Sequence, residues 1–492
     1  KQIAGYLQKQ NINIHSATVS KAILDHYQKD YTFSVPILAM SGLCGIPGKD
    51  AFSHIPQLPF ERSLLPRKFY RLLNLSVVSY AIPALVAVGI VIFKKKNSGL
   101  FWRMVRKFSV PHALKILHRM LPESGGYLEA IPLTAFVALS LINAGYGETE
   151  VVKKGIDFLK STQCEDGGWP IDVDLSTWVT SLSVKAFRSN LNGFIDTDLQ
   201  DKITDHFKLI QTKSVHPFNG SGPGGWGWTN FPGSVPDGDD TPGTILAMLR
   251  MEPASLVKRE VYDGCRWLFR LQNSDGGFPT FSKGWGKLPF DQSCSDLTGH
   301  SLLAFSSVME TYGDDLSGRQ KKRLVKAFEK ALQYLEKHQR RDGSWLPLWF
   351  GNQLTEDHTN PVYGTARVVT YLKDSLEHGW LSEEFRQRLA RLVSNGKQYL
   401  ISVQNKDGSW GGAKNIPGTM EETALAVSAL ASVENREVCD AGLTWLDNFY
   451  RQNGLKPAPI GLYFASLWYD EKLYPVTAYL EAVSRMMELP EV

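Results

Sequence analysis

Cysteine is scarce in this chain of 492 residues, and its five copies are scattered without a CxxC pair. This spacing argues against a disulfide framework or a zinc knuckle and favours a reducing compartment. Excess charge is also lacking, because the net charge is only +4, so the sequence gives no reason to expect a nucleic-acid partner. The chain begins at Lys1 rather than at a methionine, and we therefore do not exclude a longer natural N-terminus with a signal peptide.

Aromatic residues, in contrast, are abundant, with 13 Trp, 18 Tyr and 24 Phe. Such numbers allow a large aromatic lining as well as a core. The length exceeds what one ordinary core supports, so we expect two domains.

One long stretch lacks charge. From Leu75 to Phe93 the chain is almost wholly apolar and then stops at three lysines, as a transmembrane segment would. Pro83 interrupts it and no second span follows, so we expect a buried or membrane-contacting helix. The following residues, 101–121, are basic with Phe and Trp on the apolar side. They fit either a helix in a membrane interface or an ordinary solvated face.

A repeated turn is the strongest organisational signal after residue 120. Its pattern is Gln, two variable residues, Asp-Gly, a small residue and an aromatic. It occurs at four places: Gln163–Trp169, Gln272–Phe278, Gln339–Trp345 and Gln404–Trp410. Glycine can adopt a positive φ in such turns, and the aromatic can pack on a neighbouring unit. We interpret these turns as structural staples without chemistry.

Each turn is followed by an apolar helical pattern, and these patterns share a register when one threonine of each is aligned. The aligned residues are Thr134, Thr180, Thr241, Thr298, Thr365 and Thr423. A unit of helix, turn and helix repeated in this way predicts an all-α, double-layered toroid, whose inner helices begin around one mouth.

Three carboxylates crowd the start of one inner helix: Asp237, Asp239 and Asp240. One such residue would ordinarily cap the helix, but three exceed that need, and their repulsion predicts that the cluster holds a proton at neutral pH. His300 and Asp296 belong to the next repeat, so we expect His300 to reach these carboxylates.

An acid beside an aromatic cavity fits protonation of an alkene followed by steering of the carbocation, because aromatic faces stabilise a cation without capturing it. Any one aromatic is at least as consistent with core packing. The candidates for substrate contact are Trp178, Trp228, Phe231, Phe290, Trp349 and Tyr463, and Asp296 joins them at the acidic side of the mouth.

The repeated turns, the DGDDT run at 237–241 and the SDLTGH segment at 295–300 resemble the squalene-hopene cyclase family of class II triterpene cyclases. The resemblance implies that Asp239 is the proton donor, that Asp237, Asp240 and His300 assist it, and that no metal or cofactor is needed. It further implies two α/α barrel domains, residues 1–170 and 171–492, with the active-site cavity between them. The first would be a partial barrel with a membrane-contacting segment, attached to one leaflet on the cytoplasmic side.

Departures from that family bear on the substrate. Ile131 stands where hopene cyclases carry a glutamine, and Glu421 and Glu422 replace neutral polar residues. We therefore expect a polyprenyl substrate that is either squalene-like or a prenylated aromatic. The sequence is also compatible with a homodimer.

Two other functions remain open. A protein prenyltransferase subunit would need a zinc site, for which Cys294, Asp296 and His300 are close in sequence. A non-catalytic polyprenyl-binding protein could use the same scaffold. The DDxxD motif of metal-dependent diphosphate ionisation is absent from the sequence.

Overall fold

The computed structural model describes residues 17–27, 31–45, 51–64, 82–97, 99–251, 254–281, 291–462 and 467–490. These divide into two compact units. The first unit runs to Asp174 and includes the short stretches 217–220 and 231–234, and the second unit holds the rest from Leu175. The predicted boundary at 170/171 lies four residues before this division.

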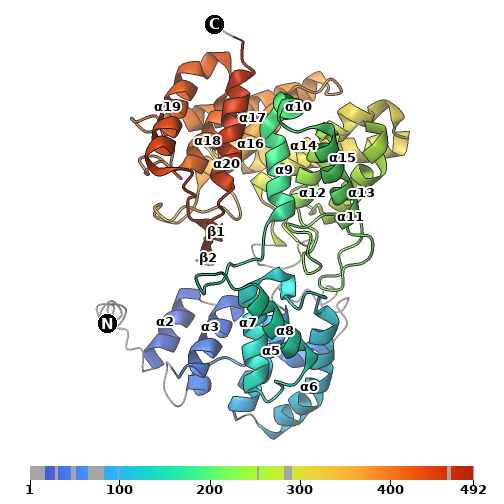
Figure 1. The fold of residues 1–492 in the computed structure, drawn as a ribbon, viewed down its shortest axis with the longest axis vertical. Helices are drawn as coiled ribbons and strands as arrows, with labels where there is room; N and C mark the ends of the chain where they lie inside the picture. The colour runs from blue at the N-terminus through green and yellow to red at the C-terminus, as the bar shows by residue number, and fades with distance from the viewer. Residues whose placement is uncertain are drawn as a thin grey trace. The chain divides into compact units, whose positions relative to one another are not determined.

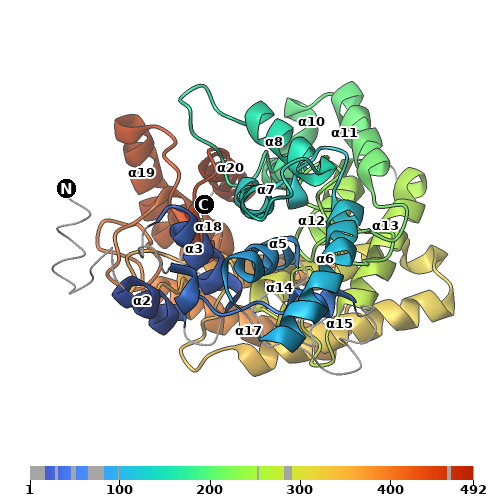
Figure 2. The ribbon, with the colours of Figure 1, turned by 90° about the horizontal axis from the view of Figure 1, so that it is seen from below.

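The first unit is helical (Figure 2). Its α-helices are α2 (Ala17–Tyr27), α3 (Tyr31–Leu43), α5 (Ile82–Lys95), α6 (Leu100–Met120), α7 (Ile131–Asn143) and α8 (Glu150–Ser161). Its 3-10 helices are η1 (Ala51–His54), η2 (Phe60–Leu64) and η4 (Tyr127–Glu129). Helix α5 packs against α7 and α3 and forms the centre of this unit.

The described part of the apolar stretch is a core helix. In α5 every residue from Val86 to Ile92 is buried. None of the helices in the described ranges is long and apolar enough to cross a membrane. Residues 75–81 of the stretch lie outside the described residues, so the expectation of a buried helix is met over residues 82–93.

Two layers of helices make up the second unit (Figure 1). The inner helices are α9 (Ser176–Phe187), α12 (Asp240–Met251), α14 (Ser295–Tyr312), α16 (Pro361–Leu376), α18 (Met420–Leu430) and α20 (Tyr474–Met487). The outer helices are α11 (Thr197–Ile210), α13 (Ala254–Leu271), α15 (Gly318–His338), α17 (Glu383–Ser402) and α19 (Arg436–Asn453). Short helices join them: η5 (Arg188–Asn190), α10 (Leu191–Phe194), η7 (Gly313–Asp315) and η8 (Val433–Asn435).

The inner helices form a closed ring. Each contacts the next in chain order, from α9 through α12, α14, α16 and α18 to α20, and α20 returns to α9. The outer helices α13, α15, α17 and α19 each pack on the inner helix that precedes them in the chain. This arrangement is the predicted all-α toroid. Helices α14, α16 and α18 bury most of their residues, because both neighbours and an outer helix cover them.

A two-stranded antiparallel sheet is the exception to the all-helical expectation. Strand β1 (Ile460–Leu462) pairs with β2 (Leu467–Tyr469), and Gly461 lies opposite Trp468. Gly461 has φ 141°, a conformation that a side chain would disfavour and that no helix uses. Tyr463, which we predicted as a substrate contact, lies outside the described residues.

The repeated turns act as staples between the layers. Gln272, Gln339 and Gln404 each donate from Nε2 to a glycine carbonyl in their own turn and to a carbonyl of the next outer helix. Gln211 makes the same pair of bonds at a turn whose sequence lacks the full pattern. These contacts tie each turn to the neighbouring outer helix and support the structural interpretation of the turns.

Five of the six aligned threonines bind the backbone of the turn that precedes their helix. Thr241, Thr298, Thr365 and Thr423 each accept, at Oγ1, the backbone N–H of the turn's aromatic at 3.0 Å, and Thr134 does so in the first unit. Thr180 does not fit this register. Its helix α9 starts instead at the carbonyl of Trp228, which accepts the N–H groups of Thr177 and Trp178.

Candidate active site

The acid loop, residues 237–240, is held by backbone contacts at the start of α12. Asp237 caps the helix, because its Oδ1 accepts the N–H groups of Asp239 at 2.8 Å and Asp240 at 2.7 Å. Gly238 donates its N–H to Thr280 at 2.7 Å, and a Cβ there would lie 2.5 Å from the carbonyl oxygen of Pro279. Only glycine therefore fits between the first two aspartates.

Asp239 and His300 form a direct pair. His300 Nδ1 lies 2.6 Å from Asp239 Oδ1. The imidazole is 2% exposed, whereas the Asp239 side chain is 21% exposed and is thus the accessible member of the pair. The neighbouring repeat does bring the histidine to the carboxylates.

Burial favours the protonated, neutral forms of Asp237 and Asp240. It raises the pKa of Asp237 to about 7, against the N–H groups of Asp239 and Asp240, which lower it. Burial also raises the pKa of Asp240 well above its usual value, and the adjacent Asp237 raises it further. The cluster therefore keeps a proton at neutral pH, but burial is the larger cause and repulsion the smaller one.

Burial likewise lowers the pKa of His300 to about 4, although its bond to Asp239 acts in the opposite direction. The imidazole is therefore neutral at pH 7. With its hydrogen on Nδ1, it donates to Asp239 and can stabilise a carboxylate there.

Aromatic rings enclose His300. Tyr371 stacks on the imidazole with ring centres 4.6 Å apart, and Trp178 meets it edge-on at 6.0 Å. The Arg367 guanidinium lies over the rings of both Trp178 and Tyr371. The predicted contact Trp178 is thus beside the acid pair, whereas Tyr371 and Arg367 were missed, because a tyrosine and an arginine one helical turn apart on a buried helix carry no distinctive sequence signal.

A second aromatic group borders the acid loop. Phe281 lies between Trp228 and Trp349, with ring centres 5.8 and 6.0 Å away. Trp349 Nε1 donates to the hydroxyl of Thr280, whose carbonyl binds Gly238. The structure therefore brings two predicted aromatics together through Phe281.

Three predicted contacts remain to be placed. Phe231 is 37% exposed and belongs to the first unit, so it is not part of the core around the acid loop. Phe290 lies outside the described residues. Asp296 is buried in the first turn of α14, where burial and then Asp239 raise its pKa to about 6.

The zinc ligands of the prenyltransferase hypothesis do not assemble. Among the described residues, which include Cys294, Asp296 and His300, no three His, Cys, Asp or Glu side chains converge on a metal-sized site. His300 is paired with Asp239 instead, and the Cys294 thiol lies 3.8 Å from the carbonyl of Phe278.

A small cavity of about 40 Å³ lies inside the ring. Its walls come from α9, α16, α18, α20 and β1, together with the loop before α16. They include Trp178, Phe350, Tyr363, Arg367, Glu421 and Tyr474. Trp178 borders both His300 and this cavity, so its indole lies between the cavity and the acid pair.

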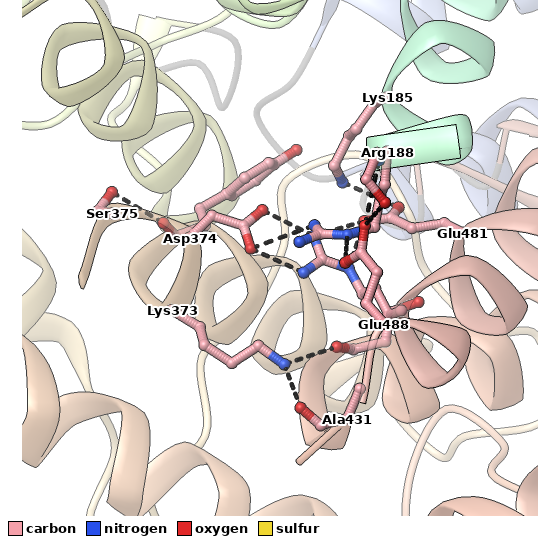
Figure 3. A network of polar contacts seen from close by, with 12 residues as sticks. Lys185, Arg188, Lys373, Asp374, Ser375, Ala431, Glu481 and Glu488 are labelled. Atoms are coloured by element: carbon pink, nitrogen blue, oxygen red, sulfur yellow. Dashed lines mark hydrogen bonds and ion pairs between the residues drawn. The ribbon is translucent and has the colours of Figure 1, made fainter. Parts of the chain in front are cut away.

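A network of ion pairs joins α9, α16 and α20 on the side away from the acid loop (Figure 3). Lys185 at the end of α9 pairs with Glu481 of α20 at 3.0 Å. Arg485 of α20 makes two bonds of 2.7 Å to Asp374 at the end of α16 and also contacts Glu481. The ring is thus held by charges at one end and carries its acid loop at the other.

The chain has relatives among terpene cyclases. The profile of the squalene-hopene cyclase C-terminal domain matches residues 216–458. Over 383 residues the chain is 27% identical to an enfumafungin synthase of Hormonema carpetanum, an alignment that covers 70% of this chain and 27% of that protein. Over 195 residues it is 31% identical to a drimenyl diphosphate synthase of Streptomyces showdoensis, covering 40% of this chain and 31% of the relative. The chain thus spans less than a third of the length of these relatives.

Among solved structures, an ent-copalyl diphosphate synthase from Streptomyces platensis aligns with 98% of this chain and 91% of its own. The TM-score is 0.52 at 15% sequence identity, so this similarity concerns the fold.

Proposed function

We propose that this chain, whose residues 216–458 match the squalene-hopene cyclase C-terminal domain, is a class II terpene cyclase of that family. Asp239 donates a proton to the terminal alkene or epoxide of a polyprenyl substrate, and the resulting cation closes rings as the bound chain folds. The substrate is squalene-like or a prenylated aromatic.

One observation carries this proposal: Asp239 is the exposed member of a buried acid cluster and is 2.6 Å from a neutral histidine. An alkene is a very weak base, so the acid must be strong and its anion must be stabilised as it forms. The His300 N–H supplies that stabilisation, and Asp237 holds the backbone of Asp239 in place.

The aromatic groups support the later steps. Trp178 beside His300, and Trp228 and Trp349 beside the acid loop, offer ring faces near the point of protonation. Each ring face stabilises a cation by about 0.5–2 kcal/mol where water is excluded, and none offers a nucleophilic lone pair.

The test uses Asp239→Asn, which keeps the shape of the side chain but removes its acid. We expect consumption of squalene, of farnesyl and geranylgeranyl diphosphates and of a geranylgeranylated hydroxybenzoate to fall by at least about a hundredfold for whichever of them the native protein cyclises. Asp314→Asn on the exposed turn η7 is the matched control and should leave the rate unchanged. Cyclisation by Asp239→Asn at the native rate would exclude Asp239 as the donor. We expect a chelator to leave native turnover unchanged, and loss of turnover on chelation would contradict a metal-free reaction.

We also propose monotopic attachment to the cytoplasmic leaflet through α6. Phe101 and Phe108 on this helix are 70% and 76% exposed, and Leu100, Trp102 and Met104 are exposed with them. Arg103 and Lys107 are exposed on the same helix, and cytoplasmic leaflets carry anionic lipids that attract such side chains. An exposed apolar group of this kind, flanked by basic residues, favours a helix in a membrane interface over an ordinary solvated face for residues 101–121.

Sedimentation with anionic phospholipid vesicles tests the attachment. Phe101→Asp combined with Phe108→Asp should weaken binding by at least about tenfold, because burying one Phe contributes roughly 1.5–3 kcal/mol. Leu209→Asp with Leu354→Asp, at exposed apolar positions of the second unit, should bind as the native protein does. Equal binding by both double variants would contradict a role for α6.

A further inference from the structure

Glu421 is a second carboxyl group at the mouth of the ring, and one of its oxygens has no hydrogen-bond partner in the described parts of the chain. It lies in the first turn of α18, is 5% exposed and lines the cavity inside the ring. Its Oε1 accepts the N–H of Ala458 at 2.9 Å. Its Oε2 is buried and has no hydrogen-bond partner among the described residues.

A buried oxygen without a hydrogen-bond partner destabilises the folded protein. Leaving a buried polar atom without a partner disfavours folding by about 1–3 kcal/mol. The adjacent Glu422 also has a buried Oε2 without a partner among the described residues, but its Oε1 accepts bonds from Asn352 and Asn360, both at 2.9 Å, and it does not line the cavity. Glu421 is therefore the carboxyl whose free lone pairs border an open space.

Aromatic rings form part of the wall around Glu421. Phe350 stacks on Tyr363 with ring centres 4.4 Å apart and approaches Tyr474 at 6.1 Å, and all three rings line the cavity with Glu421. The volume of about 40 Å³ admits one group the size of a methyl or a water molecule.

The ring places Glu421 across from the acid loop. In the closed order α9, α12, α14, α16, α18, α20, helices α12 and α18 are opposite members. Asp239 precedes α12 directly and Glu421 lies in the first turn of α18, so both stand at the end of the ring where the inner helices begin. A substrate that spans this end would meet the donor at one side and Glu421 at the other.

We propose that Glu421 is the base that ends the cyclisation, an inference that rests on the proposed function. The final cation carries a methyl group into the cavity, Glu421 Oε2 removes one of its protons, and the C–H electron pair forms a C=C bond. The product is an exocyclic methylene isomer of the substrate. Asp239 has lost one proton and Glu421 has gained one, and exchange with water restores both.

The environment of Glu421 strengthens it as a base. Burial, and then Glu422 and Asp470, raise its pKa to about 8, against the N–H of Ala458, which lowers it. The other titratable or charged groups that line its cavity are Tyr363 and Arg367 on α16 and Tyr474 and Glu481 on α20. The basic form of Glu421 therefore becomes dominant as the pH rises through about 8.

The experiment measures product identity by NMR and mass spectrometry for Glu421→Gln and, as a second replacement of similar length, Glu421→Met. We expect both variants to consume substrate while the exocyclic methylene share falls at least tenfold in favour of alcohols or endocyclic alkenes. Glu422→Gln is the matched control and should keep the native ratio. In the native protein the exocyclic share should rise through pH 8, and it should be independent of pH in Glu421→Gln.

The outcomes separate the two proposals. If the native protein returns every substrate unchanged, the proposed function fails. If the native protein cyclises a substrate and both folded Glu421 variants give the native product ratio, this inference alone is overturned.

Discussion

At the scale of the residue, the site depends on two short contacts, one between Gly238 and Pro279 and one between Asp239 and His300. Only glycine fits at position 238, because a Cβ there would lie 2.5 Å from the carbonyl oxygen of Pro279. Asp239 then meets His300 at 2.6 Å. The sequence predicted the members of this group from their spacing, but it could not predict that burial, more than mutual repulsion, keeps the cluster protonated.

His300 offers a test at this scale. His300→Phe keeps a ring against Tyr371 but removes the N–H that faces Asp239. A hydrogen bond to a charged group contributes about 1.5–3 kcal/mol, so we expect kcat to fall roughly ten- to a hundredfold with KM little changed. His300→Gln, which retains an N–H donor, should recover part of the loss. If His300→Phe turned over substrate at the native rate, His300 would have only a packing role in the core.

At the scale of the element, one contact recurs in successive units. The threonine near the start of an inner helix accepts the N–H of the aromatic in the preceding turn. Aligning threonines in the sequence located this contact in five units. It failed at Thr180 because α9 starts from the carbonyl of Trp228 rather than from the turn at 163–169, which belongs to the first unit.

Thr423→Val tests the staple. The substitution preserves shape but leaves the buried N–H of Trp410 without its acceptor, so the free energy of unfolding should fall by about 1–3 kcal/mol. Thr197→Val, at an exposed position of α11, should change it by less than about 0.5 kcal/mol. Denaturant unfolding of both variants measures the difference, and equal losses would show that the contact adds no stability.

At the scale of the whole molecule, the second unit depends on closing its ring. The last inner helix, α20, must join both α18 and α9, which lie far apart in the sequence. The ion network provides part of that junction, because Arg485 reaches Asp374. Lys185 likewise reaches Glu481, and both of these residues are labelled in Figure 3. Removing one partner of such a buried pair leaves the other charge uncompensated.

Arg485→Met should therefore lower the free energy of unfolding by about 3–5 kcal/mol at pH 7. Arg451→Met, which removes an exposed pair with Asp447, should cost at most about 0.5 kcal/mol. An equally small effect of Arg485→Met would contradict a role of the network in closing the ring.

The network also predicts a pH dependence. Burial alone would raise the pKa of Glu481, but Lys185 and Arg485 lower it to about 2, and Arg485 and Arg188 hold the pKa of Asp374 lower still. Their stabilisation is complete above the unfolded pKa of about 4 and is lost as the pH falls toward 2. The difference between native protein and Arg485→Met should shrink over this range in denaturant titrations, and a constant difference would contradict the pairing.

The sequence by itself determined the helical toroid, the repeated turns and the acid cluster with its histidine, because periodicity, turn residues and short-range spacing are local properties. Only the tertiary structure decided which distant residues share a space. Phe281 between two tryptophans, Arg367 over Trp178 and Glu421 on the helix opposite the acid depend on ring closure and side-chain packing, which no local pattern encodes. The small β1–β2 sheet was missed for the same reason, since its pairing is formed between segments rather than within one.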